Sequence, residues 1–154
     1  MKTSDVDFEF PVLGFTENKD IWGFPDLNTL TSCGPITLKE NLQDGMELID
    51  ARGKRWRVES IRRTGRGRPL LRWLFDAVLS TRQSRIEHEL TELDPVTLAE
   101  AKQRTCEAIN AFAENYCAED ERDTVLEPLL AQVRAAADIG SLYELLQPDS
   151  FMSY

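Results

Sequence analysis

The sequence predicts a single α+β domain over residues 1–154, in which a small antiparallel sheet with a central hairpin is covered by a long helix and C-terminal helices. Three patterns support this fold class. They are an apolar alternation around a turn in residues 45–61, a second alternation in residues 85–93, and helical spacing that begins at Pro95. A chain of this length holds one domain with a proper core and is too short for two ordinary ones.

The central hairpin has the most regular pattern. Met46 and Leu48 alternate with polar residues before the sequence Asp-Ala-Arg-Gly at 50–53, and Trp56 and Val58 continue the alternation after it. Such an alternation on both sides of an Asp-x-x-Gly turn is typical of a β-hairpin. The glycine supplies a positive φ, and the aspartate accepts hydrogen bonds from the turn backbone. We therefore expect Trp56 in the core.

The first forty residues have less regular patterns. Residues 7–12 alternate acidic and apolar side chains, which predicts a short edge strand stopped by Pro11. Glycine, proline and asparagine interrupt residues 14–29, so we expect a loop there with its aromatic side chains packed beneath it. Beyond that loop, either residues 30–33 or residues 36–38 add a further strand.

After the hairpin, residues 62–68 combine two glycines with four arginines and predict a turn. Pro69 suits the first position of a helix, and the apolar residues of 70–79 follow helical spacing. A strand is then expected over residues 85–93. The sequence Asp94-Pro95 is a typical helix start, and the apolar spacing that follows predicts a long amphipathic helix to Tyr116.

The last forty residues predict two further helices. An acidic linker is expected over residues 119–123, followed by a helix over residues 124–138 that ends at Gly140. Ser141 and Glu144 have the spacing of a capping box, which predicts a short final helix.

Charge is distributed unevenly along the chain. Residues 1–51 hold ten acids and three bases, residues 52–86 two acids and eleven bases, and residues 87–154 fifteen acids and four bases. A basic segment therefore interrupts an otherwise acidic chain, whose formal net charge is −9. Such an asymmetry marks a binding face or an internal pairing of the basic segment with the acidic ones.

The residues that commonly carry catalysis are few. The single histidine, His88, alternates with apolar neighbours and is expected as a partly buried strand residue. The enzymatic alternative pairs the thiol of Cys33 with His88, but no cysteine-hydrolase signature surrounds Cys33. We also find no nucleophile elbow, zinc-binding helix, phosphate-binding loop or dinucleotide fingerprint. The sequence therefore predicts a protein that is not an enzyme, with no cofactor and no metal site.

Sequence features also bear on location. The first residues lack the apolar core of a signal peptide, and no apolar run approaches the ~20 residues of a membrane span. Three cysteines without paired spacing indicate reduced thiols, and Cys106 and Cys117 are expected to pack as small apolar groups. These observations predict a cytoplasmic protein without a membrane partner.

Two charged groups are candidate binding surfaces. Nine cations lie between Arg52 and Arg72, with tryptophans interleaved, which is a pattern suited to phosphate neutralisation and base stacking. Clustered single-sign charge equally suits the recognition of a protein partner. The candidate partner-binding residues are Arg62, Arg63, Arg66, Arg68, Arg72, Trp73, Glu114, Glu119, Asp120, Glu121 and Asp123. Nucleic-acid binding through residues 52–72 is the alternative to protein binding.

Three features follow one another within residues 45–116. They are Gly-x-x-Leu-x-Asp-x-x-Gly-x-x-Trp-x-Val at 45–58, Ser-Arg-Ile-Glu-His-Glu-Leu at 84–90, and the helix expected after Asp94-Pro95. With these features the segment resembles small bacterial immunity-type proteins. This resemblance implies a compact, cytosolic, non-catalytic α+β protein that binds and blocks a co-encoded toxin. The resemblance carries no catalytic residue, and it implies that an acidic surface occludes a basic site on the toxin.

Overall fold

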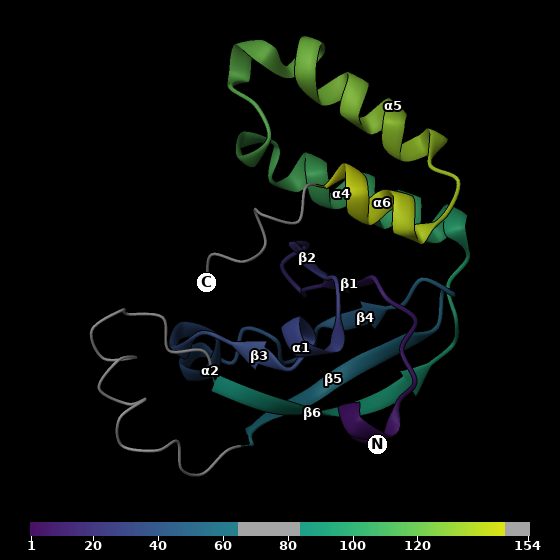
Figure 1. Ribbon diagram of the computed structural model, residues 1–154. Helices are drawn as coiled ribbons and strands as arrows, with labels where there is room; N and C mark the ends of the chain where they lie inside the picture. Colours follow the sequence, from purple (N-terminus) through teal and green to yellow (C-terminus); the bar gives the residue numbers. More distant parts are fainter. Residues whose placement is uncertain (65–83, 147–154) are drawn as a thin grey trace.

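The computed structural model describes residues 1–64 and 84–146, and it shows a mixed α/β fold with one curled antiparallel sheet, as the sequence predicts (Figure 1). The strand order is β2-β1-β4-β5-β6-β3. The strands are β1 (Val12–Phe15), β2 (Ile21–Phe24), β3 (Ser32–Cys33), β4 (Glu47–Ile49), β5 (Arg55–Arg63) and β6 (Ser84–Leu93).

The central hairpin of β4 and β5 is confirmed. Leu48 pairs with Trp56 across the two strands, and both side chains are buried. In the connecting turn, the Asp50 carboxylate accepts hydrogen bonds from the backbone N–H groups of Arg52 at 3.0 Å and Lys54 at 2.9 Å. Gly53 has a φ of +82°, and a Cβ there would lie 2.6 Å from a backbone carbonyl oxygen. The turn therefore requires its glycine.

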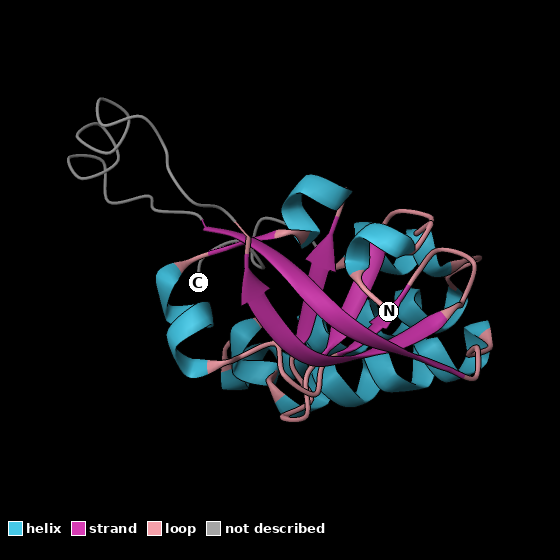
Figure 2. Ribbon diagram, turned by 90° about the horizontal axis from the view of Figure 1, so that it is seen from below, coloured by secondary structure: helices cyan, strands magenta, loops and turns pink. Residues whose placement is uncertain are grey.

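The strand expected over residues 85–93 is also confirmed, as β6. It pairs antiparallel with β5, with a register shift between Val58 and Ser60. Together β5 and β6 form a long twisted ribbon (Figure 2). The other edge of β6 is covered by short segments. The backbone N–H groups of Leu90, His88 and Ile86 donate to Met1 O, Thr3 Oγ1 and Thr31 O respectively.

Two expectations for the N-terminal third are wrong. The strand expected over residues 7–12 begins only at Val12, so Pro11 precedes β1 instead of ending a strand. The loop expected over residues 14–29 contains β2 and pairs with β1 as a hairpin. All four residues of β1 are buried, so the segment lacks the alternation that identifies a half-exposed strand.

Of the two alternatives for a further strand, the first is partly right. Residues 30–33 contain the two-residue strand β3, which pairs with the start of β6. Residues 36–38 lie instead in the helix α2 (Pro35–Glu40), which has proline at its first position. The short helix α1 (Leu27–Leu30) connects β2 to β3 and is capped by the carboxylate of Asp26.

The long helix α4 (Leu98–Ala111) begins later and ends earlier than the sequence predicts. Its N-cap is Thr97, which exchanges hydrogen bonds with Glu100 in a capping box, so the expected start at Asp94-Pro95 is wrong. Val96 stays outside the helix because its N–H donates to Gly53 O and its side chain is buried. Beyond α4 the chain forms a 3₁₀ turn, η2 (Ala113–Asn115).

The expected C-terminal helices are displaced. The 3₁₀ turn η3 (Glu119–Glu121) and the π turn η4 (Arg122–Leu126) precede α5 (Glu127–Ala135), which is followed by α6 (Ile139–Leu145). Gly140 lies inside α6 and does not end a helix. The N-cap of α6 is Asp138, whose carboxylate accepts from Ser141 N at 2.7 Å, so the expected capping box of Ser141 and Glu144 is wrong.

The sheet separates two apolar cores. On one side, α4, α5 and α6 pack over β1, β2 and β4, with α4 and α6 next to the sheet and α5 beyond them (Figure 1). This helix-side core includes Leu13, Phe15, Ile49, Ile109, Leu130 and Leu142. The inner core, within the curl of the sheet, consists of Phe8, Val12, Phe24, Leu30, Met46, Leu48, Trp56, Val58 and Leu90. Within the described ranges, no helix has the length and apolar character needed to cross a membrane.

Candidate functional site

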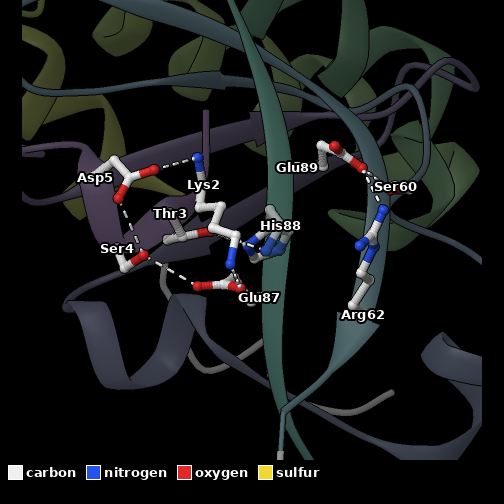
Figure 3. Close-up of polar contacts among 9 residues, drawn as sticks. All are labelled: Lys2, Thr3, Ser4, Asp5, Ser60, Arg62, Glu87, His88 and Glu89. Atoms are coloured by element: carbon white, nitrogen blue, oxygen red, sulfur yellow. Dashed lines mark hydrogen bonds and ion pairs between the residues drawn. The ribbon is translucent and has the colours of Figure 1, made fainter.

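His88 is held by two side chains at one end of the inner core. Its side chain is buried, and it extends from β6 toward Thr3 (Figure 3). The ring Nδ1 lies 2.9 Å from Thr3 Oγ1, and Nε2 lies 2.8 Å from Gln43 Oε1. Because an amide oxygen only accepts, Nε2 carries the proton and the Thr3 hydroxyl donates to Nδ1. Burial lowers the pKa of His88 to about 4, so the ring is neutral and both nitrogens are engaged.

The cysteines do not supply an activated nucleophile. Cys33 is buried in β3, and burial raises the pKa of its thiol, which disfavours the reactive thiolate. Cys106 and Cys117 pack against the helix-side core as small apolar groups. Burial raises the pKa of Cys106 as well. Among residues 1–64 and 84–146, no cluster of three His, Cys, Asp or Glu side chains has the arrangement of a metal site.

Much of the described basic segment is paired internally. Arg52 lies within 4 Å of three carboxylates, those of Asp7 at 3.9 Å, Glu9 at 3.3 Å and Asp50 at 3.6 Å. On β5, Arg62 pairs with Glu89 of β6 at 3.1 Å (Figure 3). These carboxylates reduce the positive potential that phosphate neutralisation along a nucleic acid requires.

Two other arginines of the segment share one carboxylate with a residue of α4. Arg55 and Arg57 of β5 each lie 3.5 Å from the carboxylate of Glu47 on β4, and Arg104 of α4 lies 2.6 Å from it. Burial alone would raise the pKa of Glu47, but the hydrogen bond and charge of Arg104 and the charge of Arg55 more than offset burial. The pKa of Glu47 is therefore lowered, and its carboxylate stays ionised at neutral pH.

The arginine cluster around Glu47 was not among the candidate partner-binding residues that the sequence indicated. Glu47 and Arg57 are direct cross-strand partners in the hairpin, and Arg55 lies two residues from Arg57 on the same face. The hairpin register would have placed these three side chains together. Arg104 joins them only because of where α4 packs, for which the sequence gives no signal.

The candidate cations lie partly outside the described residues. Arg62 and Arg63 are exposed at the end of β5, which lies on the side of the sheet away from α4, α5 and α6 (Figure 1). The remaining candidates from residues 52–73, and the helix expected over residues 70–79, lie outside the described ranges. These remaining candidates are Arg66, Arg68, Arg72 and Trp73.

The acidic candidates come from consecutive turns between α4 and α5. Glu114 lies in η2, Asp123 lies in η4, and Glu119, Asp120 and Glu121 form η3; all five are exposed. None of the five forms an ion pair with a cation of the described ranges. In Figure 1 these turns lie at the top, with the sheet between them and the end of β5 that carries Arg62 and Arg63. The structure thus gathers the acidic candidates and separates them from these two arginines.

Comparisons with protein-family models, with curated proteins and with solved structures find no match to this chain. The class of protein therefore has to be inferred from the fold and from the arrangement of the charged side chains.

Proposed function

We propose that this chain is a non-catalytic protein-binding module of the bacterial immunity type, which binds and blocks a co-encoded toxin through its acidic turns. One observation carries the proposal: the exposed carboxylates of η2, η3 and η4 have no cationic partner within the described ranges, whereas the cations Arg52 and Arg62 are paired with carboxylates. The acidic segment is defined here as Glu114, Glu119, Asp120, Glu121 and Asp123.

The charge of the acidic segment favours a cationic partner. Across residues 114–123 there are five acids and one base, Arg122, and every one of these charged side chains is exposed. Like charges held close together on a folded surface attract a complementary partner at long range and raise the association rate. A toxin with a basic active site or a basic substrate groove has the matching chemistry.

Engagement of His88 and Cys33 supports a binding role over catalysis by this pair. His88 uses both ring nitrogens for Thr3 and Gln43, and the thiol of Cys33 is buried. A general base needs a free ring nitrogen within reach of the proton that it removes. The two side chains that the enzymatic alternative requires therefore serve the interior of the protein.

The test is binding to the product of the neighbouring gene, measured as an association rate at low and high salt. The first variant combines Glu119→Lys, Asp120→Lys and Asp123→Lys. It should lower the association rate by at least about tenfold at low salt, because it reverses charges that steer the encounter. These side chains are exposed and form no ion pair with the residues that the structure describes, so the stability of the protein should change little.

The matched control carries the same change in net charge at three exposed acids elsewhere. It combines Glu40→Lys, Glu92→Lys and Glu144→Lys, and its association rate should stay much closer to that of the original protein. An equal loss in both variants would assign the effect to net charge and remove the acidic segment from the proposal. Failure to bind or inhibit any neighbouring gene product would refute the immunity function itself.

A further inference from the structure

Four charged side chains meet on the helix side of the sheet, and their charges do not balance. The guanidinium groups of Arg55, Arg57 and Arg104 all lie within 3.5 Å of the single carboxylate of Glu47. Three positive charges thus share one negative charge at contact distance. Guanidinium groups remain protonated at any ordinary pH, so this excess cannot be relieved by loss of a proton.

A second carboxylate near the cluster, that of Glu100, is engaged in capping α4. Glu100 lies close enough for Arg55 and Arg104 to contribute to the lowering of its pKa, after the larger contribution of its hydrogen bonds with Thr97. Its Oε2 accepts from Thr97 N at 2.7 Å, which is one half of the capping box of α4, and also from Thr97 Oγ1 at 3.0 Å. Glu100 therefore moderates the excess charge at a distance and makes no direct ion pair with the cluster.

A second observation points to a missing acceptor. The Nε–H group of Arg55 is buried and has no hydrogen-bond partner within the described ranges. A buried donor without an acceptor is destabilising, and folded proteins rarely leave one unsatisfied. The side chains of Arg57 and Arg104 are 49% and 34% exposed, so the cluster can be reached from solvent on their side.

We propose that Arg55, Arg57 and Arg104 form a binding site for a phosphate group. A phosphate ester carries about −1.5 to −2 charges at neutral pH, which would bring three guanidinium groups and one carboxylate close to neutrality. Guanidinium forks match phosphate oxygens in geometry and form strong charge-assisted hydrogen bonds with them. A carboxylate ligand would leave one positive charge unbalanced. The site lies apart from the acidic segment, so it does not depend on the proposed function.

The test is a titration of the protein with inorganic phosphate at constant ionic strength, followed through the Nε–Hε NMR signals of its arginines. Phosphate should shift the signal of Arg55 along a saturating curve, because its Nε–H gains an acceptor. Acetate and chloride at the same ionic strength should give no saturating shift. A nucleoside monophosphate titrated in parallel distinguishes free phosphate from a phosphate ester as the preferred source, because the preferred ligand binds more tightly.

Three variants separate binding from folding. Arg57→Ala removes a half-exposed side chain and should weaken phosphate binding at least about tenfold, as expected for one charge-assisted hydrogen bond. Arg85→Ala removes an exposed arginine of β6 and should leave the affinity unchanged. Glu47→Gln removes the competing carboxylate and should strengthen binding even though it weakens the apo fold.

Two results would overturn the phosphate site. The first is an Arg55 signal that responds to phosphate no more than to chloride, which would mean that the anion only screens the cluster. The second is equal phosphate affinity in the original protein, Arg57→Ala and Glu47→Gln, which would place any bound phosphate elsewhere.

Discussion

Acidification should destabilise this protein through His88 before most of its carboxylates protonate. The ordinary pKa of 6.5 falls to about 4 in the folded state because the ring is buried. Between these two values the unfolded chain binds a proton at His88 and the folded chain does not, so the free energy of unfolding falls as the pH falls. The contribution is fully present above about pH 6.5 and is lost progressively toward pH 4.

The size of the effect follows from the shift. A difference of about 2.5 pKa units corresponds to a total of about 3 kcal/mol, of which about 2 kcal/mol is lost between about pH 7.5 and pH 5. This loss is a substantial fraction of the ~5–15 kcal/mol free energy of unfolding of an ordinary domain. His88 alone should therefore produce a clear shift of the urea midpoint over this range.

The assay compares the original protein with His88→Gln by urea unfolding at several pH values. Glutamine cannot take up a proton, and every other ionisable group is common to both proteins. The stability difference between them should therefore narrow by about 2 kcal/mol between about pH 7.5 and pH 5. Parallel curves for the two proteins would refute the assignment. Because the chain has a single histidine, its ring signals also give the titration midpoint directly, and we expect it near pH 4.

Three further predictions concern the turn and the helix caps. Gly53→Ala should lower the free energy of unfolding by about 1–3 kcal/mol, because alanine at this position would have a positive φ and a Cβ 2.6 Å from a carbonyl oxygen. The control, Gly140→Ala inside α6, should be neutral or stabilising. Thr97→Ala should lower the free energy of unfolding by about 1 kcal/mol because it removes the N-cap of α4, and Asp94→Ala should change it little. A larger loss of stability in Asp94→Ala than in Thr97→Ala would show that Asp94 is the cap. Asp50→Ala should cost at least about 2 kcal/mol in chemical unfolding because it leaves the turn N–H groups without their carboxylate, and a neutral result would show that water replaces it.

The elements that the sequence predicted well are those with local signals. In the central hairpin, the alternating apolar side chains before and after the turn are all buried in the inner core, and the turn needs both its aspartate and its glycine. β6 likewise alternates, with His88 and its apolar neighbours buried and the intervening side chains more exposed. Alternation of this kind depends only on neighbouring residues, so it is visible without knowledge of the tertiary structure.

The elements that were missed depend on distant contacts. The whole of β1 and most of β2 are buried, so their glycines and aromatic residues resemble a loop rich in apolar groups. The start of α4 is delayed because Val96 first bonds to Gly53, more than forty residues earlier in the chain. No pattern near Pro95 records that contact.

The candidate binding surfaces also differ in whether their residues are close in sequence or are brought together by the fold. The acidic segment was identifiable because its residues are close in sequence and lie on successive turns. The pairing of Arg62 with Glu89 requires the register of β5 against β6, and the position of Arg104 beside Glu47 requires the docking of α4 on the sheet. Charge counts along the chain could not separate internally paired cations from those that remain in excess.

The short segments along the side of β6 that faces away from β5 bear on the tendency of the protein to aggregate. Without Met1, Thr3 and Thr31, the outward amide groups of Leu90, His88 and Ile86 would form a ready template for the strand of another molecule. By accepting hydrogen bonds from these amide groups, Met1, Thr3 and Thr31 oppose the addition of a strand from another molecule. Shortening the chain by its first five residues should lower its solubility limit more than its helical content.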